Sequence, residues 1–201
     1  MIYLIRHAPT ASNLNGIMVK NYSAQNILPF DKDIIENNIP TSVDKVYTSK
    51  AIRAKQTADV LYPEAEQKTL ECLNEFECHG IGERKFWEMN EDEFNSMVSE
   101  KVNPEIMLDS MLDMWQTLTK ISEDTGDIVC ISHGLKIRTF IHFLKCMKSG
   151  SVKSEDFNPY RLINSMDEKF CNLDVLKVSS DFEYEIIESG IKTHGFAEKV
   201  N

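Results

Sequence analysis

Two apolar segments of this chain each end at a histidine, and each is followed by a stretch typical of a helix start. The segment over residues 2–6 precedes His7, and the segment over residues 128–132 precedes His133. Short runs of apolar and β-branched residues without alternation predict strands that are buried on both faces of a parallel sheet. In an open α/β sheet, ligands bind beyond the carboxyl ends of the strands, so we expect the two histidines to meet in one crevice.

The rest of the chain repeats this order of strand and helix. Residues 9–15 are expected to form a polar loop, and residues 16–44 an irregular segment with one short helix near 31–37. We therefore predict an α/β three-layer sandwich, with helices on both faces of a mostly parallel central sheet. The other elements that periodicity and breaker residues predict are a strand over 45–48, a helix over 50–62, a short strand near 69–70, a helix over 134–147 and closing strands over 170–179 and 182–188.

A further helix is predicted after Asn103, which suits the N-cap, with Pro104 at the first helical position and Gly126 as the stop. Its apolar positions 107, 111, 114, 118 and 121 favour a helix that packs one face on the core over a coil that binds a partner. We expect one domain over residues 1–201, with residues 85–125 as a small helical insertion. The part before the helix is rich in Met and Trp, which suggests the hypothesis of a cap over the crevice.

The composition argues against several classes of protein. A formal net charge of -10 disfavours nucleic-acid binding, because contact with a phosphate backbone needs a basic face. No window approaches about 18 uninterrupted apolar residues, so we expect no membrane span, and the N-terminus lacks the pattern of a signal peptide. The five cysteines include no CxxC pair, which favours reduced thiols and a cytoplasmic location. Both a monomer and a homodimer remain open.

Two arginines accompany the histidines at positions where a cation needs a partner. Arg6 ends a strand that should be buried, where an unpaired guanidinium is costly and requires a carboxylate or an anionic ligand. Arg53 lies in the first turn of a predicted helix and opposes its dipole by about 0.3–1 kcal/mol, a cost that a bound phosphate would offset. A solvated Arg53 would be an equal alternative if it stood alone. We expect no metal site, because metal-ligand spacing is absent and the arginines would repel a cation.

Four short motifs occur in order between residues 6 and 138, about two-thirds of the chain. They are Arg6-His7-Ala8-Pro9-Thr10 followed by Asn13, Thr48-Ser49 followed by Arg53-Ala54 and Thr57-Ala58, Leu73-Asn74-Glu75, and Ile131-Ser132-His133-Gly134 followed by Ile137-Arg138. In this order and spacing they resemble the histidine phosphatase superfamily, in its phosphoglycerate mutase-like branch. The chain departs from the family at Ala8, where glycine is more frequent, and after Glu75, where the usual glycine–aromatic–glutamate–glycine stretch is replaced.

The resemblance implies a role for each polar residue of the motifs. His7, in its neutral form, would attack phosphorus and form a phosphohistidine. Glu75 would protonate the leaving oxygen and then activate water, with Glu77 and Glu83 as rivals for this role. No metal or cofactor is implied, because cationic side chains supply the positive charge. The phosphoryl oxygens would be held by Arg6, Arg53 and His133, with Asn13 adding a neutral hydrogen bond.

The resemblance therefore predicts a metal-independent phosphatase that hydrolyses a small phosphorylated metabolite. A phosphoglycerate mutase is the second candidate, although family members with that activity are usually longer than 201 residues. A catalytically silent relative that serves as a binding module is the third, and the presence of both histidines, both arginines and a candidate acid argues against it. The physiological substrate stays open, because specificity is carried by loops.

Overall fold

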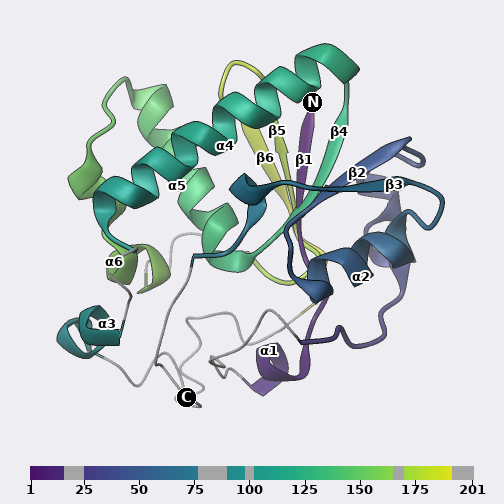
Figure 1. Cartoon of the computed structure of the whole chain (residues 1–201), viewed down its shortest axis with the longest axis horizontal. Helices are drawn as coiled ribbons and strands as arrows, with labels where there is room; N and C mark the ends of the chain where they lie inside the picture. The colour runs from purple at the N-terminus through teal and green to yellow at the C-terminus, as the bar shows by residue number, and fades with distance from the viewer. Residues whose placement is uncertain (16–24, 77–89, 98–101, 165–169, 192–201) are drawn as a thin grey trace.

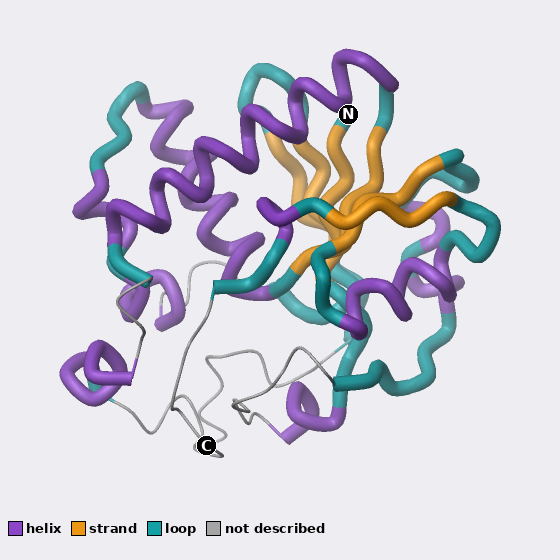
Figure 2. Tube along the Cα trace, in the orientation of Figure 1, coloured by secondary structure: helices purple, strands orange, loops and turns teal. Residues whose placement is uncertain are grey.

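One sheet of six strands lies at the centre of the molecule, in the order β3-β2-β4-β1-β5-β6 (Figures 1 and 2). The computed structural model describes residues 1–15, 25–76, 90–97, 102–164 and 170–191. The strands β3, β2, β4 and β1 run parallel, whereas β5 runs antiparallel to β1 and β6 to β5. The strand bounds are Ile2–Arg6 for β1, Lys45–Thr48 for β2, Glu66–Thr69 for β3, Ile128–Ser132 for β4, Val175–Val178 for β5 and Tyr184–Ile187 for β6.

The register of the inner strands brings their carboxyl ends to one edge of the sheet. Arg6 at the end of β1 pairs with Ser132 at the end of β4, and β2 runs parallel to β4 on its other side. The residues that follow these three strands are His7, Ser49 and His133, so all three leave the sheet at the same edge.

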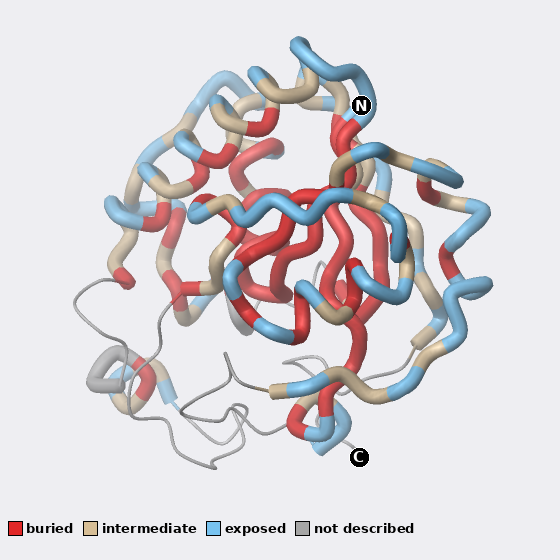
Figure 3. The backbone as a smooth tube through the Cα atoms, turned by 45° about the vertical axis from the view of Figure 1, so that its right-hand side comes forward, coloured by how far each residue is buried: buried red, intermediate tan, exposed pale blue. Residues whose placement is uncertain are grey.

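Helices cover both faces of the sheet, which confirms the predicted three-layer sandwich (Figure 1). Helix α2 (Ile52–Leu61) lies on one face, and α4 (Pro104–Thr125) and α5 (Gly134–Ser149) lie on the other. Successive residues of β1 contribute to the two sides: Leu4 belongs to the core cluster under α4 and α5, and Ile5 to the cluster under α2. Figure 3 shows the buried residues concentrated in the strands between these layers.

Helix α4 begins and ends where the sequence predicts. The side chain of Asn103 accepts a hydrogen bond from the backbone N–H of Ile106 at 2.9 Å, Pro104 opens the helix, and Gly126 ends it with a φ of 87°. Its apolar stripe enters the same core cluster as β1, β4 and α5. The prediction of a helical insertion over 85–125 also covers residues outside the described ranges, and it stays a prediction.

Two local predictions in the first forty residues differ from the structure. The expected loop over 9–15 contains the short helix α1 (Ala11–Asn15), because the carbonyl of Thr10 accepts from the backbone N–H groups three and four residues later. In place of one helix near 31–37 there are two single-turn 3-10 helices, Lys32–Ile34 and Glu36–Asn38. The helix α3 (Glu91–Met97) lies within the predicted helical insertion over 85–125. The sequence made no prediction for three other short elements: the 3-10 helices Glu71–Leu73 and Ser154–Phe157, and α6 (Pro159–Asn164).

The strand predicted over 170–179 is too long at its start, since β5 covers only Val175–Val178. Before it the chain turns: the backbone N–H of Asp174 donates to the carbonyl of Cys171 at 3.2 Å, and Leu173 adopts a φ of 64°. A left-handed backbone costs a residue other than glycine about 1–3 kcal/mol, and it persists only where the surroundings enforce it. This turn lies against the end of β1, because the backbone N–H of Leu173 donates to the carbonyl of Arg6 at 3.0 Å.

None of the helices in the described part of the chain is long and apolar enough to cross a lipid bilayer.

Replacing Leu118 by Ala should lower the free energy of unfolding by about 2–5 kcal/mol, because the fully buried side chain would leave a cavity in the core cluster around α4. The matched control is Ile106→Ala on the same helix, where the side chain is 41% exposed and the expected change is below about 0.5 kcal/mol. Urea denaturation measures both values. Equal losses in the two variants would contradict the packing of α4.

Candidate active site

The two histidines that end β1 and β4 lie side by side. The ring centroids of His7 and His133 are 5.2 Å apart, with the ring planes inclined by 60°. Both side chains are almost completely buried, with 4% and 1% of their surfaces exposed. The structure thus brings together the pair that the sequence predicts from two segments more than a hundred residues apart.

Arg53 in the first turn of α2 bridges the two imidazoles. Its Nε–H donates to Nε2 of His7 at 2.9 Å, and its Nη2 donates to Nδ1 of His133 at 2.7 Å. A guanidinium carries only donors, so each of these ring nitrogens presents a lone pair. Arg53 is therefore not the solvated side chain that was its alternative interpretation, and only 4% of it is exposed.

The other ring nitrogen of each histidine fixes the tautomer. Nδ1 of His7 lies 2.7 Å from the carbonyl oxygen of Ala8 and donates its proton to it. Nε2 of His133 lies 2.7 Å from Oγ of Ser49, the residue that follows β2, and donates to it. Burial, and then the charge of Arg53, hold the pKa of both histidines well below the ordinary value of 6.5. Both imidazoles are therefore neutral, and His7 presents the lone pair of Nε2 to the site.

Arg6 is a buried cation that lacks a carboxylate partner in the described part of the chain. Its side chain is 3% exposed, its Nη1 donates to the carbonyl of Phe170 at 2.6 Å, and its buried Nε makes no hydrogen bond to the described residues. A Cβ on Gly134 would lie 3.1 Å from this Nε, so glycine there lets the guanidinium lie against the start of α5. Glu75 and Asp174 act on this cation only from beyond ion-pairing distance. A buried charge without a close counter-ion costs several kcal/mol, which favours an anionic ligand at this point.

Asn13 lies half-buried in α1, and its side-chain oxygen is bound to the protein. That Oδ1 accepts from the backbone N–H and the hydroxyl of Thr10, at 3.1 and 3.0 Å, and from Nδ2 of Asn172 at 3.3 Å. These contacts fix the orientation of the amide, so its Nδ2 group points away from these partners. Such an oriented neutral donor is suited to a phosphoryl oxygen.

Glu75 lies at the N-terminus of α5, close to the segment of the second histidine. Its carboxylate accepts backbone hydrogen bonds from Leu135 at 3.1 Å, Lys136 at 3.0 Å and Phe76 at 3.1 Å. Burial raises the pKa of this carboxyl, whereas these hydrogen bonds and the charge of Arg53 act in the opposite direction. The rival acids over 77–83 lie outside the described residues, so their positions are not compared with that of Glu75.

Four side chains near the site were given no individual role by the sequence. Ser49 accepts from His133, and Thr57 accepts from the backbone N–H of Ala8 at 2.9 Å; both belong to a recognised motif that already contains Arg53.

The other two are Asn172 and Lys136. Asn172 lies in the turn before β5 and donates to the carbonyl of His7 at 2.7 Å. Its only sequence signal is Asn and Asp close together before an apolar run, a pattern that predicts a turn. Lys136 is 2% exposed, and burial lowers its pKa to about 8.

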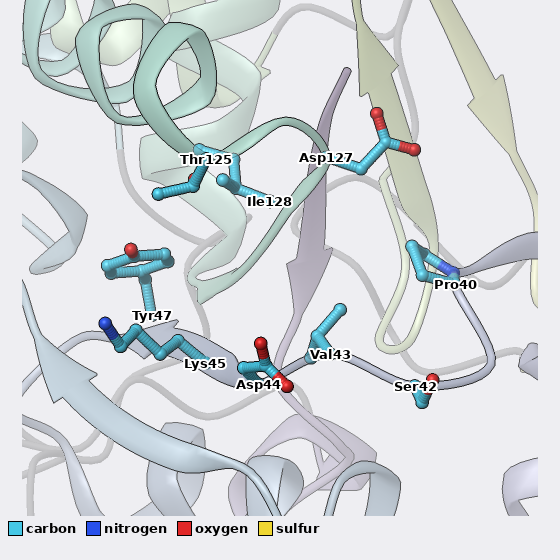
Figure 4. Close-up of a pocket in the computed structure, with 9 residues that line it drawn as sticks. All are labelled: Pro40, Ser42, Val43, Asp44, Lys45, Tyr47, Thr125, Asp127 and Ile128. Atoms are coloured by element: carbon cyan, nitrogen blue, oxygen red, sulfur yellow. The ribbon is translucent and has the colours of Figure 1, made fainter.

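A cavity of about 500 Å³ lies at the opposite edge of the sheet, where β2 and β4 begin (Figure 4). It contains none of the predicted site residues, and it lies away from the strand ends that carry the two histidines. We therefore assign it no part in the chemistry of His7 and His133. Its lining is Pro40, Ser42, Val43, Asp44, Lys45, Tyr47, Thr125, Asp127 and Ile128.

A model of the histidine phosphatase superfamily (branch 1) matches residues 37–160, which include Arg53, Glu75 and His133. Because this match covers more than half of the chain, the protein belongs to the histidine phosphatase superfamily. The predicted family is thereby confirmed. A comparison with curated protein sequences finds no match.

Solved structures share the fold at low sequence identity. Phosphoserine phosphatase from Entamoeba histolytica, in complex with 3-phosphoglyceric acid, has a TM-score of 0.65 and 21% identity over 87% of this chain and 88% of that one. A putative alpha-ribazole-5'-P phosphatase from Escherichia coli has a TM-score of 0.63 and 14% identity over 92% and 94%. Phosphoglycerate mutase from Bacillus anthracis has a TM-score of 0.58 and 16% identity over 96% and 92%. At these identities the likeness establishes the fold.

The neutral imidazoles predict a dependence of stability on pH. The pKa of each histidine in the folded protein lies below its value near 6.5 in the unfolded chain. At a pH between these two pKa values, the unfolded chain therefore binds more protons than the folded protein. The stability from the neutral imidazoles is therefore full above pH 6.5 and is lost as the pH falls below it. Each histidine contributes up to about 1.4 kcal/mol per pH unit to the slope.

The free energy of unfolding, measured by denaturant titration between pH 7.5 and 5, tests this expectation. The double variant His7→Gln and His133→Gln should show a shallower decline toward acid than the parent protein. Glu75 has a raised pKa and acts in the opposite direction, but it is present in both proteins and leaves the comparison intact. Identical slopes would show that the two imidazoles are not held neutral.

Proposed function

We propose that this protein is a metal-independent phosphatase that hydrolyses a small phosphomonoester through a phosphohistidine on His7. The observation that carries the proposal is the lone pair of His7 Nε2, which accepts from the buried guanidinium of Arg53 and lies within the electrostatic influence of the buried Arg6. A nucleophile of this kind needs no base to activate it, since the neutral imidazole is already the reactive form. Membership of the histidine phosphatase superfamily supports the same chemistry.

In the first step, His7 Nε2 attacks phosphorus opposite the leaving oxygen. The N–P bond forms as the P–O bond breaks, and protonated Glu75 transfers its proton to the leaving oxygen. In the second step, the ionised Glu75 takes a proton from water while that water attacks the phosphohistidine. Inorganic phosphate leaves, and His7 and Glu75 return to their starting forms.

The guanidinium groups would hold the oxygens of the transferring group. On binding, the Arg53 donors turn from the two imidazoles to phosphoryl oxygens, which frees the lone pair of His7 Nε2. The buried Nε of Arg6 supplies another donor, and the phosphate dianion compensates the charge of this desolvated cation. The same dianion raises the pKa of His133, so that its imidazole can share a proton with a phosphoryl oxygen. Asn13 contributes its side-chain amide from α1.

The position of Glu75 suits an acid that must give and take a proton. Burial favours its neutral form before the first step, whereas the backbone N–H groups at the start of α5 stabilise the ionised form that remains after it. Because burial and hydrogen bonding act in opposite directions, both the neutral and the ionised form of the carboxyl are accessible during the reaction.

A phosphoglycerate mutase is the second candidate, because a structure of that name from Bacillus anthracis shares the fold. Two proteins described as phosphatases, from Entamoeba histolytica and Escherichia coli, share it as well and support hydrolysis. Both reactions use the phosphohistidine, and they differ in whether water or the substrate accepts the phosphoryl group. Stoichiometric release of phosphate from phosphomonoesters supports the phosphatase. Interconversion of phosphoglycerate isomers without net release would support the mutase.

Replacing His7 by Ala should remove turnover and the covalent phosphoenzyme together, with a loss of at least about 10³-fold in kcat, because the proposed N–P bond forms on this imidazole. Rapid quenching with a ³²P-labelled ester measures the phosphoenzyme, which should be stable in base and labile in acid. His142→Ala on α5 is the matched control, since this half-buried histidine packs against Phe157 outside the site. A labelled His7→Ala protein would exclude His7 as the nucleophile.

Replacing Glu75 by Gln should slow phosphoenzyme formation from alkyl phosphates by about 10²–10⁴-fold, because an alkoxide leaves poorly without a proton. Formation from p-nitrophenyl phosphate should change far less, since its leaving group is stable as an anion. Glu71→Gln, at an exposed position one turn earlier, is the control and should leave both rates unchanged. Equal losses with the two esters would assign the proton to another acid, with Glu77 and Glu83 next in line.

A further inference from the structure

The peptide group between His7 and Ala8 is held at both of its polar ends by buried side chains. Its carbonyl oxygen accepts a hydrogen bond from Nδ2 of Asn172 at 2.7 Å, and its N–H donates to Oγ1 of Thr57 at 2.9 Å. Thr57 belongs to α2 and donates in turn to the carbonyl of Arg53 at 2.7 Å. Asn172 belongs to the turn before β5. One peptide plane is thus held between a helix and a distant turn.

The turn that carries Asn172 is itself firmly attached to β1. The backbone N–H of Leu173 donates to the carbonyl of Arg6 at 3.0 Å, and the carbonyl of Asp174 accepts from the N–H of Arg6 at 3.2 Å. Ser189 closes the turn from outside, since its hydroxyl donates to the carbonyl of Asn172 at 2.8 Å. These bonds hold Leu173 in its left-handed conformation and aim the fully buried Asn172 side chain at the end of β1.

Asn172 also contacts Asn13, the neutral residue of the phosphate site. The same Nδ2 group that donates to the carbonyl of His7 lies 3.3 Å from Oδ1 of Asn13. An amide nitrogen has two protons, so both contacts can be made at once. One buried side chain therefore orients the backbone of the nucleophile and a donor for the phosphoryl oxygens.

We propose that Asn172 is a positioning residue, which fixes His7 for in-line attack by holding the His7–Ala8 peptide against Thr57. The proposal rests on the proposed function of His7 as nucleophile. The imidazole is attached to this peptide through its own Cα, and its Nδ1 donates to the carbonyl of Ala8 in the next peptide along the chain. A rotation of the peptide plane therefore moves Nε2 relative to the phosphorus, and in-line transfer tolerates little misplacement. Asn172 itself touches neither substrate nor reacting atoms.

The test compares Asn172→Ala and Asn172→Asp with Ser189→Ala. Aspartate keeps the size of the side chain and removes the donor, whereas Ser189→Ala loosens the same turn and leaves the donor in place. Both Asn172 variants should form phosphohistidine about 10–100-fold more slowly at saturating ester in rapid-quench experiments. Their inhibition constants for inorganic phosphate should stay within about threefold of the parent value, because Arg6, Arg53 and His133 remain. Ser189→Ala should retain the parent rate.

A merely structural role predicts a different result. In that case all three variants would lose stability in thermal denaturation, yet each would phosphorylate at the parent rate well below its melting temperature. That outcome would overturn the proposal. So would a Ser189→Ala protein that is slowed as much as the Asn172 variants, because the donor would then be irrelevant.

Hydrogen exchange separates this proposal from the function on which it rests. The Ala8 amide should lose at least tenfold of its protection in Asn172→Ala and keep it in Ser189→Ala, whether or not the parent protein turns over an ester. If the parent forms no phosphohistidine, the proposed function fails and the exchange result alone decides the positioning role. Unchanged protection of Ala8 in Asn172→Ala would overturn it.

Discussion

The bridge that Arg53 makes between two neutral imidazoles determines what the site can do. A guanidinium only donates, so it selects the ring nitrogens of His7 and His133 that present lone pairs. Burial and this fixed positive charge keep both rings unprotonated. For Arg53 to bridge the two histidines, the carboxyl ends of β1, β2 and β4 must lie at one edge of the sheet. Helix α2, which carries Arg53, must also begin directly after β2. The α/β architecture thus places the side chains of His7, Arg53 and His133 next to one another.

The start of α5 links the second histidine to the acid. His133 is the N-cap residue, Gly134 leaves room for the guanidinium of Arg6, and the next two backbone N–H groups donate to Glu75. A single helix terminus therefore contacts the second imidazole, a buried cation and a carboxylate. The glycine is required by the short approach of Arg6, since any Cβ would lie 3.1 Å from its Nε and Cζ atoms.

The sequence predicted the parts of the fold that depend on strong local patterns. The apolar runs of β1 and β4, and the caps of α4 at Asn103 and Gly126, are visible without tertiary information. The convergence of His7 and His133 followed from a rule about strand ends. The candidate role of Arg53 followed from its place in the first turn of a helix, where a bound phosphate would offset the conflict with the dipole. The role of Glu75 came from family resemblance, because no spacing rule relates it to a strand tip. The turn over 171–174 was mistaken for strand, since its left-handed Leu173 is enforced by contacts with Arg6 and Ser189 that lie far away in the sequence.

In the proposed mechanism the phosphoryl group passes through His7 and does not go directly to water. Hydrolysis of a phosphorothioate monoester made chiral with ¹⁶O and ¹⁸O, in water enriched in ¹⁷O, tests it through the configuration of the released thiophosphate. Two successive in-line displacements each invert phosphorus, so we expect overall retention of configuration. Inversion would show a single direct attack by water and would contradict the phosphohistidine mechanism.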